Sequence, residues 1–96
     1  MDESNAILLL SCPDRKGLVA RLSSFIFQNN GNIVAADQYT SKRGEYFFMR
    51  MEWELNGFAL SREEIPVAFA PLARQYDMKW TLHFTDYRPR MVIFVS

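Results

Sequence analysis

The sequence has few of the residues that mark secreted, metal-binding, nucleic-acid-binding and membrane proteins. It contains one cysteine and one histidine, and its 11 lysines and arginines balance its 11 aspartates and glutamates. One cysteine excludes an internal disulfide framework and fits the reducing cytoplasm. A net charge of zero gives no electrostatic attraction to nucleic acid or to an anionic membrane. The apolar runs are too short for a secretory signal or a membrane span, so we expect a cytoplasmic protein with neither kind of partner.

Candidate catalytic and metal-binding residues are equally scarce. Cys12 has no histidine near it in the sequence, and we expect a small buried thiol. His83 shares an alternating stretch with Thr81 and Thr85, where a surface residue is a simpler interpretation than a general base. No cysteine, histidine or carboxylate cluster has the spacing of metal ligands. We therefore expect no catalytic residue, no metal and no cofactor in this chain.

The sequence does contain enough apolar material, 49% of its 96 residues, for the core of one small domain. Its periodicities predict a βαββαβ order: a strand over 6–12, a helix from Leu18 to about Asn29, a strand over 33–40, a strand over 45–55, a helix from a capping box at Ser61 to Tyr76, and a strand over 78–85. This order is typical of an α+β, ferredoxin-like sandwich with two helices on one face of an antiparallel sheet. In that topology the first and third strands are central and the second is an edge.

Four local expectations follow from individual residues. The third strand alternates, which assigns Phe47 and every second residue up to Leu55 to the core. The first strand is apolar on both faces, which is typical of a central strand covered on both sides. Gly31 suits the left-handed position that ends a helix. Pro66 and Pro71 each remove a backbone donor, so we expect a kink or broken first turns in the second helix.

One stretch has the outline of a nucleic-acid motif. Residues 43–50 resemble an RNA-recognition strand, which occurs on the same βαββαβ fold. That strand needs exposed aromatic residues at its third, fifth and eighth positions, where this chain has Glu45, Phe47 and Arg50. Phe47 also belongs to the expected core face. Together with the zero net charge, this pattern argues against RNA binding.

The turn Ser11–Leu18, between the first strand and the first helix, is the best candidate site. The strand breaks at Pro13, and the helix begins close to Gly17. Unpaired backbone N–H groups at a helix start, together with the helix dipole, favour an anion such as a carboxylate. Gly17 allows close approach to the backbone. The alternative is that Asp14 caps the helix and Gly17 only eases the turn.

A second surface is expected at the edge strand, residues 32–40. Its unpaired backbone groups suit pairing with another copy, which gives a continuous sheet with two-fold symmetry. The turn of one copy then lies near Asn32 and Ile33 of the other. A small amino acid fits such a crevice, with its carboxylate on the helix start and its amino group at Asn32 or Asp14. Phe27 lies off the apolar helix stripe, so pairing through the helices is the alternative.

The chain ends in a polar joint, Tyr87–Arg90, and an uninterrupted apolar run, Met91–Ser96. Such runs are typical of strands buried on both faces of a parallel sheet. We expect residues 1–86 to form the small domain, and residues 87–96 to be a linker and the first strand of a truncated α/β domain. An ordinary edge strand of the small domain is the alternative.

These motifs resemble a known family. Leu10–Val19, followed by Asn30–Ile33, resembles the ACT domain, an amino-acid-binding regulatory module. With Phe47–Glu52 and Arg88–Ser96 added, the whole chain resembles the N-terminal region of the formyltetrahydrofolate deformylase family, in which a formyltransferase-like catalytic domain follows. The resemblance implies a ligand pocket formed by Asp14, Arg15, Lys16, Gly17, Leu18, Asn32 and Ile33.

The resemblance also implies a function. Enzymes of this family hydrolyse 10-formyltetrahydrofolate to tetrahydrofolate and formate, which serves purine synthesis, and the folate would bind the domain that this chain lacks. The chain itself would be an inactive, amino-acid-sensing part that works as a homo-oligomer, with methionine or glycine as candidate effectors. The alternatives are a free-standing ACT-type regulator of a partner protein and a purely structural dimerisation module.

Overall fold

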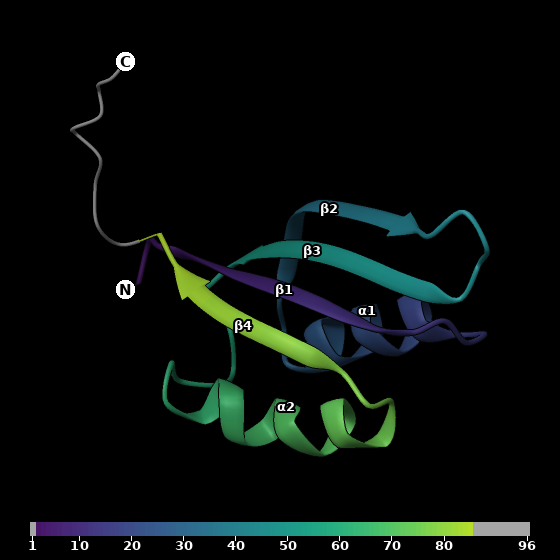
Figure 1. Ribbon diagram of the computed structural model, residues 1–96. Coiled ribbons are helices and arrows are strands. Elements are labelled where there is room, and N and C mark those ends of the chain that lie inside the picture. The colour runs from purple at the N-terminus through teal and green to yellow at the C-terminus, as the bar shows by residue number, and fades with distance from the viewer. Residues whose placement is uncertain (1, 86–96) are drawn as a thin grey trace.

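The computed structural model describes residues 2–85, and Figure 1 shows how they are arranged. In chain order the elements are β1 (Asn5–Pro13), α1 (Leu18–Gln28), β2 (Asn32–Thr40), β3 (Tyr46–Glu54), α2 (Glu64–Gln75) and β4 (Lys79–Phe84). This is the βαββαβ order that the periodicities predict.

The four strands form one antiparallel sheet in the order β2-β3-β1-β4. β1 and β3 are therefore central and β2 is an edge, as expected for this topology. Figure 1 shows α1 and α2 on the same face of the sheet. The fold is the expected α+β, ferredoxin-like sandwich.

The core lies between the sheet and the helices, and the alternation of β3 defines its sheet side. Phe47, Met49, Met51 and Trp53 are all buried. The helices add Leu18, Leu22, Ile26, Ile65, Phe69, Leu72 and Ala73. Burying a large apolar side chain contributes about 1.5–3 kcal/mol, so this stripe accounts for much of the fold's stability. Since Phe47 is buried, it cannot stack on a base as an RNA-recognition strand requires.

β1 differs from expectation because only one of its faces is covered. Leu8 and Leu10 point toward the helices and are buried, and Cys12 is fully buried as predicted. Leu9, on the other face, remains 40% exposed. Within residues 2–85 both helices lie on a single side, so the prediction of a strand covered on both faces is wrong for this part of the chain.

The end of α1 also corrects a prediction. The residue with positive φ after the helix is Asn30, at 64°, and Gly31 is not left-handed. Asparagine tolerates this conformation better than most residues, and Asn30 Nδ2 donates to the Gly57 carbonyl at 2.8 Å. Gly31 is instead required by packing, because a Cβ there would overlap the Ile26 side chain and lie 2.9 Å from a Phe58 ring carbon.

α2 begins at the predicted capping box and continues through its prolines. The Glu64 backbone N–H donates to Ser61 Oγ at 3.2 Å, and the Ser61 backbone N–H donates to Glu64 Oε1 at 2.9 Å. Pro66 lies in the first turn, where a missing N–H costs nothing. Pro71 lies inside a helix that runs without a break from Glu64 to Gln75, in contrast to the broken first turns that were one of the two expectations. The carbonyl that Pro71 leaves without a donor belongs to exposed Val67, where water can reach it.

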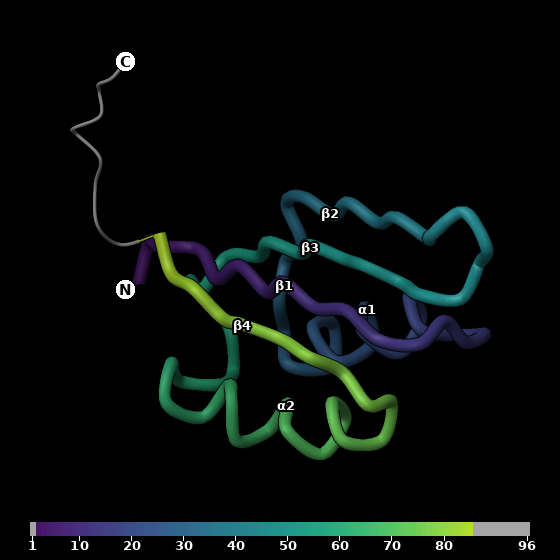
Figure 2. The backbone as a smooth tube through the Cα atoms, in the orientation of Figure 1, coloured from purple at the N-terminus to yellow at the C-terminus, as the bar shows by residue number. Residues whose placement is uncertain are grey.

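The N-terminal residues and the end of β4 lie side by side, as Figure 2 shows. The Thr85 backbone N–H donates to the Asn5 carbonyl at 3.0 Å, and the Asn5 backbone N–H donates to Thr85 Oγ1 at 2.8 Å. The predicted joint and strand over 87–96 lie outside the described residues. No helix within residues 2–85 is long and apolar enough to cross a membrane.

Candidate functional site

The turn between β1 and α1 is held by backbone contacts and leaves its glycine open. The Asp14 backbone N–H donates to the Glu45 carbonyl at 3.0 Å, which ties the turn to the residue before β3. Gly17 precedes α1 with φ of 82° and ψ of 4°, a left-handed conformation that glycine adopts without a Cβ penalty. A Cβ built on Gly17 meets no atom within 4 Å, so the space above this backbone is accessible.

The start of α1 has unused backbone donors. Its first hydrogen bond runs from the Arg21 N–H to the Gly17 carbonyl at 2.9 Å, so the N–H groups of residues 18–20 lie ahead of the helical ladder. Among the described residues no side chain caps this end, and the first turn carries no acidic residue. Asp14 therefore does not cap the helix, and the alternative that assigned it this role is not supported. The dipole and the free donors suit a carboxylate.

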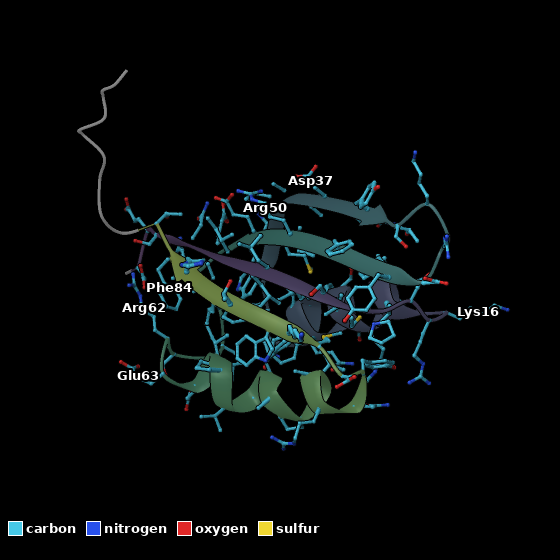
Figure 3. The ribbon with its side chains drawn as sticks, viewed as in Figure 1. Lys16, Asp37, Arg50, Arg62, Glu63 and Phe84 are labelled. Atoms are coloured by element: carbon cyan, nitrogen blue, oxygen red, sulfur yellow. The ribbon has the colours of Figure 1, made fainter. Side chains whose placement is uncertain are left out.

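The side chains of the turn differ in what they can offer a ligand. The Arg15 guanidinium carbon lies 5.0 Å from the centre of the Tyr76 ring, which follows α2, so Arg15 is anchored by a cation–π contact. Lys16 projects away from the body of the molecule (Figure 3). Leu18 is buried in the core, so only its backbone faces the turn. Asp14 and Gly17 are exposed.

Asn32 and Ile33 lie at the other end of α1, where β2 begins. Asn32 is exposed, and its Nδ2 donates to Glu54 Oε1 at 3.2 Å. Ile33 is half-buried and packs against the core. An open groove beside them, between α1 and β2, is lined by Ala20, Ser23, Phe27, Gly31, Asn32 and Ile33. Phe27 is 79% exposed at this groove, in agreement with its position off the helical stripe.

The structure does not bring the two halves of the candidate site together within one chain. α1 separates them, and a helix of 11 residues is about 16 Å long. The half at the turn therefore contains Asp14–Leu18, and the half at the edge contains Asn32 and Ile33. A ligand contacting both needs two copies, and β2 is the edge strand through which copies can pair.

Glu54 is a candidate contact that sequence reasoning missed. It pairs with Asn32 across the β2–β3 ladder and hydrogen-bonds to it. The alternation of β3 places Glu54 on the polar face, but only the strand register shows that it lies opposite Asn32. A carboxylate beside an amide is suited to bind an ammonium group.

The remaining reactive side chains offer little chemistry. Burial raises the pKa of the Cys12 thiol, and the nearby carboxylates of Asp14 and Asp77 raise it further, so the thiol stays protonated at neutral pH. His83 is exposed on β4. Within residues 2–85 there is no group of histidine, cysteine and carboxylate side chains that could hold a metal ion.

The sequence of the chain is similar to that of a known domain family and of several enzymes. The sequence profile of the ACT domain family matches residues 6–65. The chain is 46% identical over 96 residues to a formyltetrahydrofolate deformylase of Synechocystis sp., covering all of this chain and 34% of that protein. It is 38% identical over 96 residues to the formyltetrahydrofolate deformylase of Bacillus subtilis, covering 99% of this chain and 32% of the relative.

A solved structure shows that the chain is also similar to a formyltetrahydrofolate deformylase in its fold. The crystal structure of a formyltetrahydrofolate deformylase from Pseudomonas syringae pv. tomato superposes with a TM-score of 0.84 at 28% sequence identity, covering 92% of this chain and 30% of that one. The chain thus spans about a third of the length of the curated relatives it matches.

Proposed function

The chain belongs to the ACT domain family, and from this premise we propose that it is the regulatory, amino-acid-sensing domain of a formyltetrahydrofolate deformylase. The observation that carries the proposal is the 46% identity with such an enzyme over all 96 residues. The longer protein hydrolyses 10-formyltetrahydrofolate to formate and tetrahydrofolate. In this proposal residues 1–86 sense the effector, and residues 87–96 lead into the domain that binds folate and carries the catalytic residues.

The proposed ligand site is shared by two copies paired through the β2 edges. The helix start at Gly17 and Leu18 of one copy receives the effector's carboxylate on its free N–H groups. Asn32 and Glu54 of the other copy receive its ammonium group, and Ile33 contacts its side chain. The uncapped start of α1 and the open space above Gly17 support this arrangement. Asp14, Arg15 and Lys16 form the rim of the crevice and set its charge.

A site between two copies gives a simple regulatory mechanism. An amino acid that binds one arrangement of the dimer more tightly than another shifts the population toward the first. The coupling equals the difference in binding free energy, typically about 1–3 kcal/mol, and this is the free energy by which the effector biases the arrangement of the attached catalytic domains. Because the proposed contacts are backbone N–H groups for a carboxylate and Asn32 with Glu54 for an ammonium group, the crevice suits a free amino acid, with glycine and methionine as candidates. Formate release for purine synthesis in the cytoplasm is the step that such an effector would control.

The proposal is tested by isothermal titration calorimetry of the chain with a panel of amino acids. We expect heat of binding for glycine or methionine, lost in Asn32→Ala. His83→Ala is the control, because His83 is an exposed polar residue on β4, at the sheet edge opposite β2. If no amino acid gives heat or raises the melting temperature, the sensing function is refuted.

A free-standing regulator of a partner protein and a structural dimerisation module are the alternatives. The identity with deformylases over the whole chain favours a part of that enzyme over a free-standing regulator. Steady-state kinetics of the longer enzyme separate sensing from a merely structural role. An effector that changes formate release in the native enzyme, and no longer does so in Asn32→Ala, supports sensing.

A further inference from the structure

The sheet face opposite the helices carries an exposed aromatic cluster. The Phe48 ring centre lies 5.9 Å from that of Tyr39 and 5.7 Å from that of Tyr46. Leu9 lies beside them on the neighbouring strand, and both Leu9 and Phe48 are 40% exposed. Leu9, Tyr39 and Phe48 line a broad, open hollow that extends from β2 to β4, together with Ser11, Lys79 and Thr81. We call this surface the open face.

The open face exposes apolar side chains at Leu9, Tyr39 and Phe48, where a solvated face is normally polar. Both helices cover the opposite side of the sheet, and no other element among residues 2–85 covers this one. β1 is nevertheless apolar on both sides, a pattern of strands that are covered on both faces. The hollow is wide and shallow, so it suits a flat protein surface better than an enclosed small molecule.

The strand register orders the open face into two neighbouring rows. The first runs Tyr39, Phe48, Ser11, Lys79 across the sheet, and the second runs Asp37, Arg50, Leu9, Thr81. In the second row Arg50 forms two ion pairs. Its Nη1 lies 3.8 Å from Asp37 Oδ2, and its Nη2 lies 3.0 Å from Glu52 Oε1. Figure 3 shows Asp37 and Arg50 side by side. Aromatic rings therefore lie directly beside a guanidinium whose position is fixed.

We infer that the open face packs against the open face of a second copy, about a two-fold axis that runs across the strands between the two rows. Such an axis places the Arg50 guanidinium of each copy over the Phe48 ring of the other, a cation–π pairing. Tyr39 then faces Asp37, Ser11 faces Leu9, and Lys79 faces Thr81. No like charges are opposed in these rows, and the sheets pack about 10 Å apart as in a sandwich.

The alternative two-fold axis, parallel to the strands, is less favourable. It would set Arg50 against Leu9 and Glu52 against Ile7, so that this ion pair loses water without a contact across the interface, whereas the axis across the strands gives Arg50 the Phe48 ring. The axis across the strands also stacks each strand on its own counterpart. Two dimers paired through their β2 edges can then stack face to face and close as a tetramer with 222 symmetry. The inference uses a surface separate from the ligand crevice, so it does not depend on the sensing function.

Sedimentation equilibrium of the 96-residue chain tests this pairing. Val34→Lys, at an exposed position on the β2 edge, is introduced first to suppress edge pairing. In this background we expect a concentration-dependent dimer without any amino acid present. Phe48→Arg opposes arginine to arginine across the axis, so it should weaken the dimer about tenfold or more. Val67→Arg, the same type of change at an exposed position on α2, should leave the dimer unchanged.

An exchange variant distinguishes a second copy from a foreign partner. Phe48→Arg combined with Arg50→Phe recreates the pairing in reverse, because each copy again offers an arginine to the ring of the other. We expect the exchange to restore the dimer, whereas the fixed surface of a foreign partner would reject it. Circular dichroism and the melting temperature confirm that each variant is folded. A monomeric Val34→Lys chain, an unaffected Phe48→Arg dimer, or a folded exchange variant that stays monomeric would each overturn the inference.

Discussion

Arg62 binds Asp2 through two hydrogen bonds of 3.1 Å, from Nε to Oδ2 and from Nη2 to Oδ1. The same guanidinium carbon lies 4.7 Å from the centre of the Phe84 ring, and Figure 3 shows these two side chains together. One side chain thus joins the N-terminal residues, the segment before α2 and the end of β4. This contact fixes the region from which the chain continues beyond the described residues.

The Arg62–Asp2 pair makes stability depend on acid pH. The hydrogen bond from Arg62 holds the pKa of Asp2 below its ordinary value of 3.8, and the Ser4 backbone N–H adds to this effect. A carboxyl with a lower pKa when folded contributes stability that is complete above its unfolded pKa and lost as the pH falls through the folded value. Asp2→Asn should therefore lower the melting temperature at neutral pH, and its difference from the native chain should close below pH 3.8.

Glu3→Gln is the control for this prediction. It removes one negative charge from the neighbouring residue, which is exposed. Thermal unfolding of both variants, followed by circular dichroism from neutral to strongly acid pH, should show the pH-dependent difference only for Asp2→Asn. Equal curves for the two variants would mean that Arg62 does not stabilise the fold through Asp2.

Gly31→Ala should destabilise the fold although its backbone conformation is not left-handed. The new Cβ would meet the Ile26 side chain and the Phe58 ring, and overpacking of this kind costs about 1–3 kcal/mol. Urea unfolding measures the loss. Ile26→Leu removes the methyl branch that is in the way, so the cost of Gly31→Ala should be smaller in that background. An unchanged or higher stability of Gly31→Ala would contradict the packing argument.

Most of the fold could be predicted from the sequence because the elements have clear periods. The alternation of β3 identified the buried face from Phe47 to Trp53, and the capping box at Ser61 identified the start of α2. Two errors came from assigning a local role to a residue that packing controls. Gly31 is needed for a close contact, while Asn30 takes the left-handed position. Pro71 stays helical because its α2 context overrides the local preference of proline.

Less of the candidate site was accessible to sequence reasoning. The turn around Gly17 was identified from its residue types. Whether a side chain caps the start of α1, however, depends on where the Asp14 side chain lies, which the sequence does not show. Glu54 entered the site only through its register with Asn32. The open face was hidden for a related reason, since the apolar pattern of β1 does not say whether the chain itself or a second copy covers it.

Gly17→Asn separates the ligand-binding role of this glycine from its conformational role. Asparagine tolerates positive φ, so this variant should stay within about 1 kcal/mol of the native stability. Its side chain enters the open space above the turn, so heat of amino acid binding should disappear in calorimetry. Gly17→Val is a poorer test, because a β-branched residue at φ of 82° is strained whether or not a ligand binds there. A folded Gly17→Asn chain that still binds its effector would exclude this turn as the carboxylate site.

Cys12 should react with thiol reagents only when the chain opens. It is fully buried, and burial together with the carboxylates of Asp14 and Asp77 raises the pKa of its thiol. The thiolate is the reactive form, so both access and ionisation oppose the reaction in the folded chain. Labelling with a chromogenic disulfide at mildly alkaline pH should be slow for the native chain and rapid in denaturant. Equally rapid labelling in both would show that the β1–α1 turn opens readily.

Ser61→Ala should weaken the start of α2. The substitution removes the hydroxyl that accepts the Glu64 N–H, and loss of such a cap costs about 0.5–2 kcal/mol. Ser61→Asp retains an acceptor, so it should recover most of the stability in urea unfolding. Ser23→Ala, inside α1, is the matched control and should be neutral or slightly stabilising, because alanine is the better helix former.

Since Ser61 and Glu64 bond to each other, Glu64→Ala should cost less in the Ser61→Ala background than in the native chain. Additive losses would show that the two hydrogen bonds stabilise the helix independently.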